Sequence, residues 1–258
     1  MKPRVAVFKF ASCDGCQLQF LNAEDELLKL AEQVDLVYFP EARSRALEGP
    51  YDIAFVEGSI TTPDDARRII RLREESRYLV TIGACATAGG IQALRNWADI
   101  EHYRRVVYPN PEFISTLSTS TPISEHVRVD FELWGCPVDK EQLLAVVRSL
   151  LSKARPTVPA HSVCMECKRR GNVCVVVARG EPCLGPVTRT GCGALCPAFN
   201  RGCYGCFGPA DDQNMESFER LLASQAVTGD DAMRRLRGIN GYVRPWRESA
   251  DAIAAGKK

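Results

Sequence analysis

Twelve cysteines in 258 residues constrain this chain more than any other feature of its sequence. That usage is well above the ordinary, yet it is below the density of a small scaffold stapled by disulfides. The remaining composition, 45% hydrophobic and 25% charged, suits a globular protein with a real core in one large or two modest domains. The net charge of +1 gives no reason to expect a nucleic acid or an anionic membrane as a partner.

The meaning of the cysteines depends on the redox compartment. The first ten residues contain no apolar segment of signal-peptide length and no twin-arginine pair. No stretch approaches the roughly 18 to 20 apolar residues of a membrane span. We therefore expect a cytoplasmic protein with no membrane span and with reduced thiols, in which clustered cysteines indicate metal binding or catalysis rather than disulfides.

Short apolar runs alternate with helical patterns through the first half of the chain. We predict strands over residues 5–10, 34–39, 53–56, 78–82 and 127–134. Helical patterns cover residues 17–33, 62–77 and 139–151, with Thr62 and Asp139 as N-caps. Strands joined by crossover helices form a parallel sheet with helices on both faces, so the expected fold class is α/β with a doubly wound parallel sheet.

A proline-rich stretch at residues 154–159 reads as a linker, which predicts domains at 1–155 and 156–258. Eight cysteines and many glycines follow between residues 164 and 206, with little strand or helix periodicity. Such a segment buries little apolar surface, so we expect a small, irregular domain held together by metal sites. Beyond it we predict one helix, residues 215–226, and a loosely ordered ending.

The first cysteine group consists of Cys13, Cys16, Cys85 and Cys136, which follow the first, fourth and fifth predicted strands. The carboxyl ends of parallel strands share one edge of a sheet, where ligands bind. Four thiolates are the standard complement of a four-iron, four-sulfur cluster, so the pattern favours a cluster at this edge. A redox dithiol at Cys13 and Cys16, or cysteines that are merely buried, are the less favoured alternatives.

The second group has eight members, enough for two complete four-thiolate sites. They are Cys164, Cys167, Cys174, Cys183, Cys192, Cys196, Cys203 and Cys206. Clusters are favoured, but the two C-x-x-C pairs of this group are also consistent with zinc-ribbon knuckles. His161 lies three residues before Cys164 and is a further possible ligand, although the cysteine count closes without it.

Taken together, these motifs resemble the small subunit of nickel–iron hydrogenases. The matching segments are Cys13-Asp-Gly-Cys16, Glu57-Gly58-Ser59, Gly83-Ala84-Cys85, Gly135-Cys136-Pro137 and the eight-cysteine segment. The resemblance implies a flavodoxin-like domain that binds a proximal cluster, followed by a smaller domain that binds a medial and a distal one. Glu57 then orients groups at a partner interface, or is simply a solvated acid that caps a loop.

The resemblance also divides the ligands among three sites. It implies proximal ligands Cys13, Cys16, Cys85 and Cys136; distal ligands Cys164, Cys167, Cys174 and Cys183; and medial ligands Cys192, Cys196, Cys203 and Cys206. Periplasmic members often have histidine and proline where Cys164 and Cys196 stand here, so three four-iron clusters are expected. With no twin-arginine signal or C-terminal anchor, the chain looks like the cytosolic sulfhydrogenase, NAD(P)-linked or heterodisulfide-reductase-linked class.

The implied function is electron transfer. Hydrogen is activated at a nickel–iron centre in a large partner subunit, electrons pass through the three clusters, and a flavin or iron–sulfur subunit accepts them; the chain itself carries no catalytic residue. Two rivals remain open. The related quinone-reductase subunit of complex I binds one cluster through adjacent cysteines, but no Cys-Cys pair occurs here. A zinc-stabilised interaction protein is the rival from another class.

Overall fold

The computed structural model describes residues 2–256, which form two compact units divided between Pro156 and Thr157. We call residues up to Pro156 unit 1 and residues from Thr157 unit 2.

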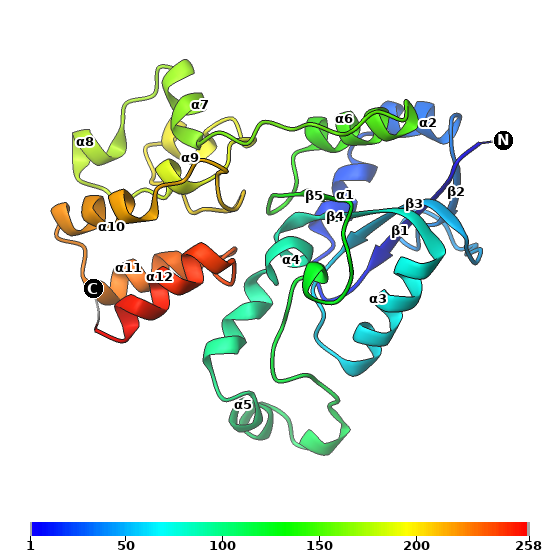
Figure 1. Ribbon diagram of the computed structural model, residues 1–258, viewed down its shortest axis with the longest axis horizontal. Helices are drawn as coiled ribbons and strands as arrows, with labels where there is room; N and C mark the ends of the chain where they lie inside the picture. The colour runs from blue at the N-terminus through cyan, green and yellow to red at the C-terminus, as the bar shows by residue number, and fades with distance from the viewer. Residues whose placement is uncertain (1, 257–258) are drawn as a thin grey trace. The chain divides into compact units, whose positions relative to one another are not determined.

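Unit 1 is built on a five-stranded sheet in which every strand pairing is parallel (Figure 1). The strands are β1 (Arg4–Lys9), β2 (Asp35–Tyr38), β3 (Tyr51–Glu57), β4 (Ser76–Ile82) and β5 (Phe131–Leu133). Their order is β2-β1-β3-β4-β5, which is the flavodoxin-like order of doubly wound sheets. The predicted α/β fold class is confirmed, although β5 is shorter than residues 127–134.

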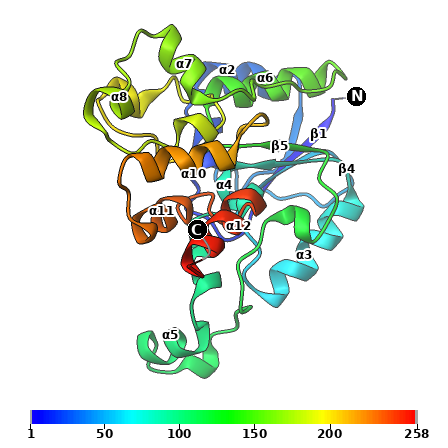
Figure 2. The ribbon, with the colours of Figure 1, turned by 60° about the vertical axis from the view of Figure 1, so that its left-hand side comes forward.

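Helices cover both faces of this sheet, with α1, α2 and α6 on one side and α3 on the other (Figures 1 and 2). The helices of unit 1 are α1 (Gly15–Leu21), α2 (Asp25–Ala31), α3 (Pro63–Glu75), α4 (Gly83–Ala88), α5 (Ile100–Val107) and α6 (Lys140–Leu151). The single helix predicted over residues 17–33 is wrong, because Glu24 has a positive φ of 48° that breaks it into α1 and α2. Residues 91–97 add a 3₁₀ helix.

The caps of α3 and α6 are as predicted. Thr62 accepts a hydrogen bond from Asp65 N, and the Asp65 carboxylate accepts one from Thr62 N, which closes a capping box. Asp139 caps α6 by accepting from Gln142 N at 2.9 Å. These caps fix where α3 and α6 begin.

Apolar side chains of the central strands form the core of unit 1. Ala54, Phe55 and Val56 of β3 and Leu79 and Val80 of β4 have no exposed surface. Strands buried on both faces read as continuous apolar runs, which is why the sequence predicted them well.

Unit 2 consists of short helices joined by irregular segments. They are α7 (Val163–Arg169), α8 (Val175–Arg179), α9 (Leu195–Ala198), α10 (Met215–Ser224), α11 (Gly229–Leu236) and α12 (Arg244–Ala254). The helix predicted over residues 215–226 is confirmed as α10. The expectation of a loosely ordered ending is wrong, because α11 and α12 follow and pack on each other.

The core of unit 2 combines apolar side chains of these last helices with cysteines. Trp246 and Leu236 are fully buried beside Phe218, and the buried Cys183 and Cys203 belong to the same cluster. Within residues 2–256, no helix is both long enough and apolar enough to cross a bilayer.

Candidate iron–sulfur cluster sites

The ends of four strands in unit 1 stand level with one another at the carboxyl edge of the sheet. Lys9 pairs with Glu57, Glu57 with Ile82, and Ile82 with Leu133. The four cysteines of the first group therefore leave this edge on the loops after β1, β4 and β5, as the sequence predicted. The loops meet at this edge, because a Cβ atom at Gly83 would lie 2.3 Å from Cys16 Sγ and 3.5 Å from Gly135 O, and one at Gly15 would lie 3.4 Å from Cys13 Sγ and 3.7 Å from Pro137 Cβ.

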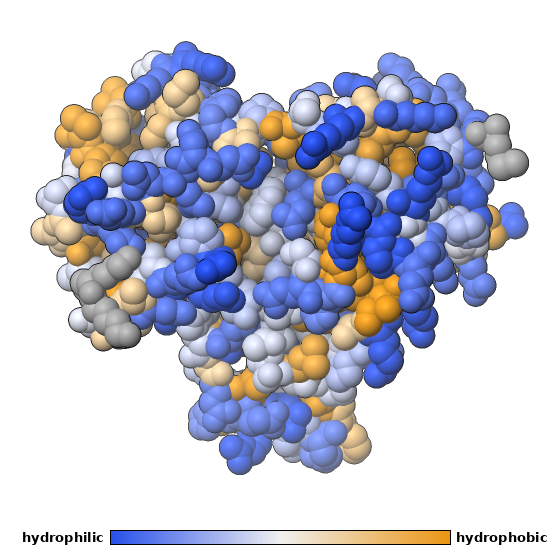
Figure 3. Space-filling model, in the orientation of Figure 1, coloured by the Kyte–Doolittle hydropathy of each residue, from blue (hydrophilic) through white to orange (hydrophobic). Residues whose placement is uncertain are grey.

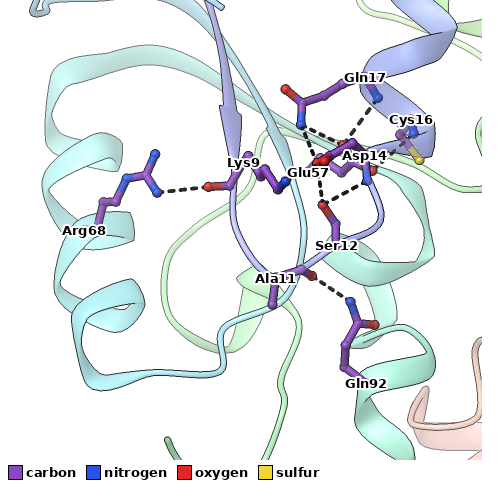
Figure 4. A network of polar contacts seen from close by, with 9 residues as sticks. All are labelled: Lys9, Ala11, Ser12, Asp14, Cys16, Gln17, Glu57, Arg68 and Gln92. Carbon is purple, nitrogen blue, oxygen red and sulfur yellow. Dashed lines mark hydrogen bonds and ion pairs between the residues drawn. The ribbon is translucent and has the colours of Figure 1, made fainter. Parts of the chain in front are cut away.

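Glu57 is the central polar group of this edge, because β3 lies between β1 and β4. Its side chain is 1% exposed, so the alternative of a solvated loop cap is wrong. Its Oε1 accepts from Cys16 N at 3.1 Å, and its Oε2 accepts from Gln17 N at 3.3 Å and Gln17 Nε2 at 2.9 Å (Figure 4). The carboxylate thus caps the amino end of α1 and fixes the backbone of Cys16.

Two further hydrogen bonds join the cysteine loops. Gln92 Nε2 donates to Ala11 O at 2.8 Å (Figure 4). The same nitrogen lies 3.5 Å from Cys85 Sγ, so Gln92 connects the loop of Cys13 to that of Cys85. Ala84 N donates to Gly135 O at 2.8 Å, which connects the loop of Cys85 to that of Cys136. Protein hydrogen bonds alone therefore link all three loops into one frame.

Close backbone approach explains the glycine that begins α4. A Cβ atom at Gly83 would lie 2.3 Å from Cys16 Sγ, and its φ of +84° is one that other residues rarely adopt. The missing side chain leaves room for the Cys16 thiol, and a thiol that binds a bulky cluster needs such room.

Burial raises the pKa of the thiols at this edge. It raises that of Cys85 to about 11 and raises that of Cys136, while burial and the nearby Glu57 raise that of Cys16. Burial also raises the pKa of Glu57 itself, against the hydrogen bonds from Gln17 and Cys16. Thiolate ligands must be deprotonated to bind metal, so these buried thiols would release protons when iron binds.

In unit 2, four cysteines line one cavity of about 130 Å³. They are Cys164, Cys167, Cys174 and Cys183, and apolar residues such as Val163 and Leu221 complete its walls. This is the set that the resemblance implies for the distal cluster. An apolar cavity ringed by sulfur donors fits a sulfur-ligated inorganic core, and His161 is not among the residues that line it.

The remaining four cysteines form two pairs in the sequence, Cys192 with Cys196 and Cys203 with Cys206. The second pair adjoins the cavity, because Cys203 N donates to Cys183 Sγ at 3.1 Å. That these two pairs close into one medial set remains a prediction. Across residues 2–256, no three cysteine, histidine or acidic side chains are arranged to hold a single metal ion.

The C-terminal helices hold the turn between Cys203 and Cys206. A Cβ atom at Gly205, whose φ is +76°, would lie 2.7 Å from the Trp246 ring, and Asn240 Nδ2 donates to Gly205 O at 2.8 Å. Trp246 Nε1 in turn donates to Gln213 Oε1 at 2.9 Å. No local sequence pattern indicates these supports, because Asn240 and Trp246 lie 35 or more residues from the turn that they contact.

Glu166 connects α7, which carries Cys164 and Cys167, to the segment around Cys192. Its Oε2 accepts from Thr190 Oγ1 at 2.7 Å and from Ala194 N at 3.1 Å, next to Cys192. Glu166, Gln17 and Gln92 were all missed by sequence reasoning. The only available signal was their proximity in sequence to cysteines, which many surface residues share.

Comparison with known proteins places the chain in a family. Residues 13–150 match the family of the NADH ubiquinone oxidoreductase 20 kDa subunit. The sulfhydrogenase 2 subunit delta of Pyrococcus furiosus is 36% identical over 234 residues, which cover 91% of this chain and 98% of that protein. The delta subunit of the NAD-reducing hydrogenase HoxS of Cupriavidus necator is 27% identical over 166 residues, covering 58% of this chain and 79% of that protein.

A solved structure agrees with these matches. A chain of the NAD+-reducing [NiFe]-hydrogenase in the H2-reduced state superposes with a TM-score of 0.58 at 32% identity, covering 62% of this chain and 96% of that one. The parallel sheet, the cysteine-bearing edge and the sequence matches agree. The chain therefore belongs to the family of the NADH ubiquinone oxidoreductase 20 kDa subunit, and over nearly its whole length it is similar to a hydrogenase delta subunit.

Proposed function

We propose that the chain is the electron-transfer small subunit of a nickel–iron hydrogenase and that its twelve cysteines hold three four-iron clusters. The observation that carries the proposal is the 36% identity over 91% of the chain to a sulfhydrogenase delta subunit. The cysteine-bearing edge of unit 1 and the four-cysteine cavity of unit 2 support it. One-electron transfer is the chemistry that such clusters supply when bound.

The twelve cysteines would divide among three cluster sites. Cys13, Cys16, Cys85 and Cys136 would hold the proximal cluster. Cys164, Cys167, Cys174 and Cys183 would hold the distal one, and Cys192, Cys196, Cys203 and Cys206 the medial one. The distal set is supported by the cavity that those four cysteines line, whereas the medial set depends on the resemblance.

The protein's own contribution is to position and shield these ligands. Glu57 and Gln92 fix the loops of unit 1, and burial excludes water from Cys16 and Cys203, which are both 6% exposed. Hydrogen bonds to sulfur, burial and nearby charge are the means by which a protein sets a cluster's reduction potential.

Two partner subunits follow from the proposal. A large subunit would carry the nickel–iron centre that activates hydrogen, and a flavin or iron–sulfur subunit would exchange electrons with the distal end of this chain. A cytoplasmic location remains a prediction. The complex I alternative is less favoured because it leaves eight cysteines unexplained and the chain has no adjacent cysteine pair.

Anaerobic purification of the complex from its host tests the proposal. We expect a brown preparation with about twelve irons per chain, matching sulfide, and a nickel-containing large subunit in equal amount. A content of only about four irons per chain would show that the unit 2 cysteines hold no clusters. A colourless zinc protein without a nickel partner would overturn the whole proposal.

A further inference from the structure

A cavity of unit 1 lies at the opposite end of the sheet from the cysteines. The amino ends of β1, β3 and β4 and the end of α6 enclose a volume of about 680 Å³. That volume is within the range of about 300 to 1,000 Å³ that small-molecule sites occupy. Strands of six or seven residues separate it from the cysteine edge, and they rise about 20 to 23 Å. A small molecule bound here would therefore not touch the cysteine sites.

Cations outnumber acids on the walls of this cavity. The cationic side chains are those of Lys2, Arg4, Arg77 and Lys153. Within residues 2–256, none of the four forms an ion pair. The single carboxylate of the walls, Asp52, accepts from Arg4 N at 2.8 Å, and the Arg4 guanidinium donates only to the backbone oxygen of Glu48. Cations gathered without carboxylate partners repel one another, so a bound anion would stabilise them.

The acids of this region lie to one side of the cavity. A neighbouring cavity of about 300 Å³ shares Asp52 and has two further carboxylates in its walls, those of Glu74 and Glu75. Neither Lys2 nor Lys153 lines that neighbour. The part of the larger cavity around these two lysines therefore has no acid in its wall, and it is there that we expect the anionic groups of a ligand.

The backbone at the end of α6 places Lys153 at the cavity wall. Ala154 N donates to Ser149 O at 2.8 Å and Lys153 N donates to Leu150 O at 3.0 Å, which is the pattern of a helix that ends in a left-handed residue. Lys153 is that residue, with a φ of 58°. Glycine is the common choice there because it has no Cβ atom. A lysine in its place carries backbone strain, and such strain is found at ligand sites.

The remaining wall of the cavity is apolar and includes one aromatic ring. Ile53, Leu150 and Leu151 line it together with the partly buried Tyr78. On the side of unit 1 where β1 begins, strongly hydrophilic side chains stand beside hydrophobic ones (Figures 1 and 3). An inorganic ion would make no use of the apolar wall, whereas a nucleobase can stack on a phenol ring.

We propose that this cavity binds a nucleotide with at least two phosphate groups. Guanidinium groups bind phosphate oxygens in pairs and lysines bind them as point charges, so the four cations match a chain of phosphates better than a single carboxylate. The base would lie against Tyr78 and the two leucines. A nucleotide bound here would join the strand ends to the end of α6 and so stabilise unit 1. The inference goes beyond the proposed function and does not depend on it, since it uses no cysteine.

Photoaffinity labelling of the anaerobically purified complex tests the proposal and locates the site. The probe is an ATP analogue with an azide on its base, which attaches under ultraviolet light to residues that touch the base. We expect peptide mass spectrometry to find the label on the peptides of Tyr78 or of Leu150 and Leu151, and excess ATP to prevent it. Pyrophosphate lacks the base and should compete at least about tenfold less well than ATP, and the dicarboxylate succinate less well still.

Variants measure the strength of binding as the probe concentration that half-saturates this labelling. Lys153→Gly removes the ammonium and supplies the residue that suits the backbone, so it should raise that concentration at least about tenfold without lowering stability in urea unfolding. Arg77→Gln should raise it by a similar factor, whereas Lys153→Arg keeps the charge and should stay near wild type. Matched controls are Lys29→Gln on α2 and Arg71→Gln on α3, exposed cations that do not line the cavity.

Several outcomes would overturn the proposal. Labelling that does not saturate, or that spreads over peptides outside the cavity, would do so. Half-saturation at the same concentration in Lys153→Gly, Arg77→Gln and the wild type would exclude the cations from binding. Pyrophosphate or succinate competing as well as ATP would show a site for anions in general. Labelling of the isolated chain but not of the complex would show that another subunit covers the cavity.

Discussion

The two units hold their cysteines by different means. In unit 1, residues 123 positions apart in sequence, from Cys13 to Cys136, meet because a parallel sheet brings its strand ends level. The hydrogen bond that Glu57 accepts from Cys16 N and those that Gln92 and Ala84 donate then hold their loops together without any metal. In unit 2, eight cysteines fall within residues 164–206 on short helices and turns, and two of them, Cys183 and Cys203, are themselves part of the core.

This contrast separates a preorganised site from one that is coupled to folding. The frame of unit 1 is a buried sheet that would be stable without ligands at its edge. In unit 2 the cysteine segment has helices of only four to seven residues, which are too short to be stable alone. Its order therefore depends on the C-terminal helices and on metal binding.

Iron removal should show the largest difference between the units. After anaerobic chelation, we expect amide hydrogens of residues 163–206 to exchange at least about 100-fold faster, because bonds to metal no longer restrain them. Amides of β1, β3 and β4 should change by less than about threefold. Hydrogen exchange followed by mass spectrometry measures both, and equal acceleration in the two units would contradict the contrast.

Trp246→Ala tests how far the C-terminal helices support the cysteine segment. Removing this 1% exposed ring from beside Gly205 should cost about 3 to 5 kcal/mol of unit 2 stability in urea unfolding. Iron held by the Cys203 pair should be lost first. The control is Phe55→Ala in β3, which has no exposed surface and should lower the stability of unit 1 alone. If Trp246→Ala lowered the stability of unit 1 alone, Trp246 would not support the cysteine segment.

Substitution of Glu57 tests the frame of unit 1. Glu57→Leu leaves the Cys16 and Gln17 amides without acceptors, and each buried unpaired donor costs about 1 to 3 kcal/mol. Glu57→Gln keeps one acceptor oxygen and should cost less. We expect the leucine variant to lose about four irons and the spectroscopic signal of one cluster. Full iron occupancy in the leucine variant would show that the sheet alone holds the loops.

The smallest effect is expected at Gln92. Gln92→Met removes the donor to Ala11 O and the N–H beside Cys85 Sγ, at a cost of about 1 kcal/mol. Because an N–H donor to a thiolate favours the reduced cluster, the reduction potential of that centre should shift to more negative values. Spectroscopic redox titration measures the shift. Gln142→Met on α6 is the control. If Gln92→Met left the reduction potential unchanged, Gln92 would only hold the loops together and would not tune the cluster.

Sequence patterns predicted the sheet of unit 1 well and the ending of unit 2 poorly, for one physical reason. Strands buried on both faces, such as β3, are continuous apolar runs that stand out in any sequence. Helix α11 buries only Ala232 and Leu236. Helix α12 buries only Trp246, Ser249 and Ala250. Both helices are amphipathic, but they span only 8 and 11 residues and contain no continuous apolar run, so they stand out less in the sequence than a buried strand does.

The sequence by itself determined the twelve thiols and the strands that precede four of them. Because parallel strand ends share one edge of a sheet, it also determined that these four would be brought to the same edge. Only the tertiary structure decided that Glu57 is buried at the centre of that edge, that Gln92 joins two cysteine loops, and that Trp246 packs on Gly205. The physical reason is range. Apolar runs and cysteine spacing involve neighbouring residues, whereas the buried carboxylate, the Gln92 amide and the supporting ring form hydrogen bonds with residues 33 to 81 positions away.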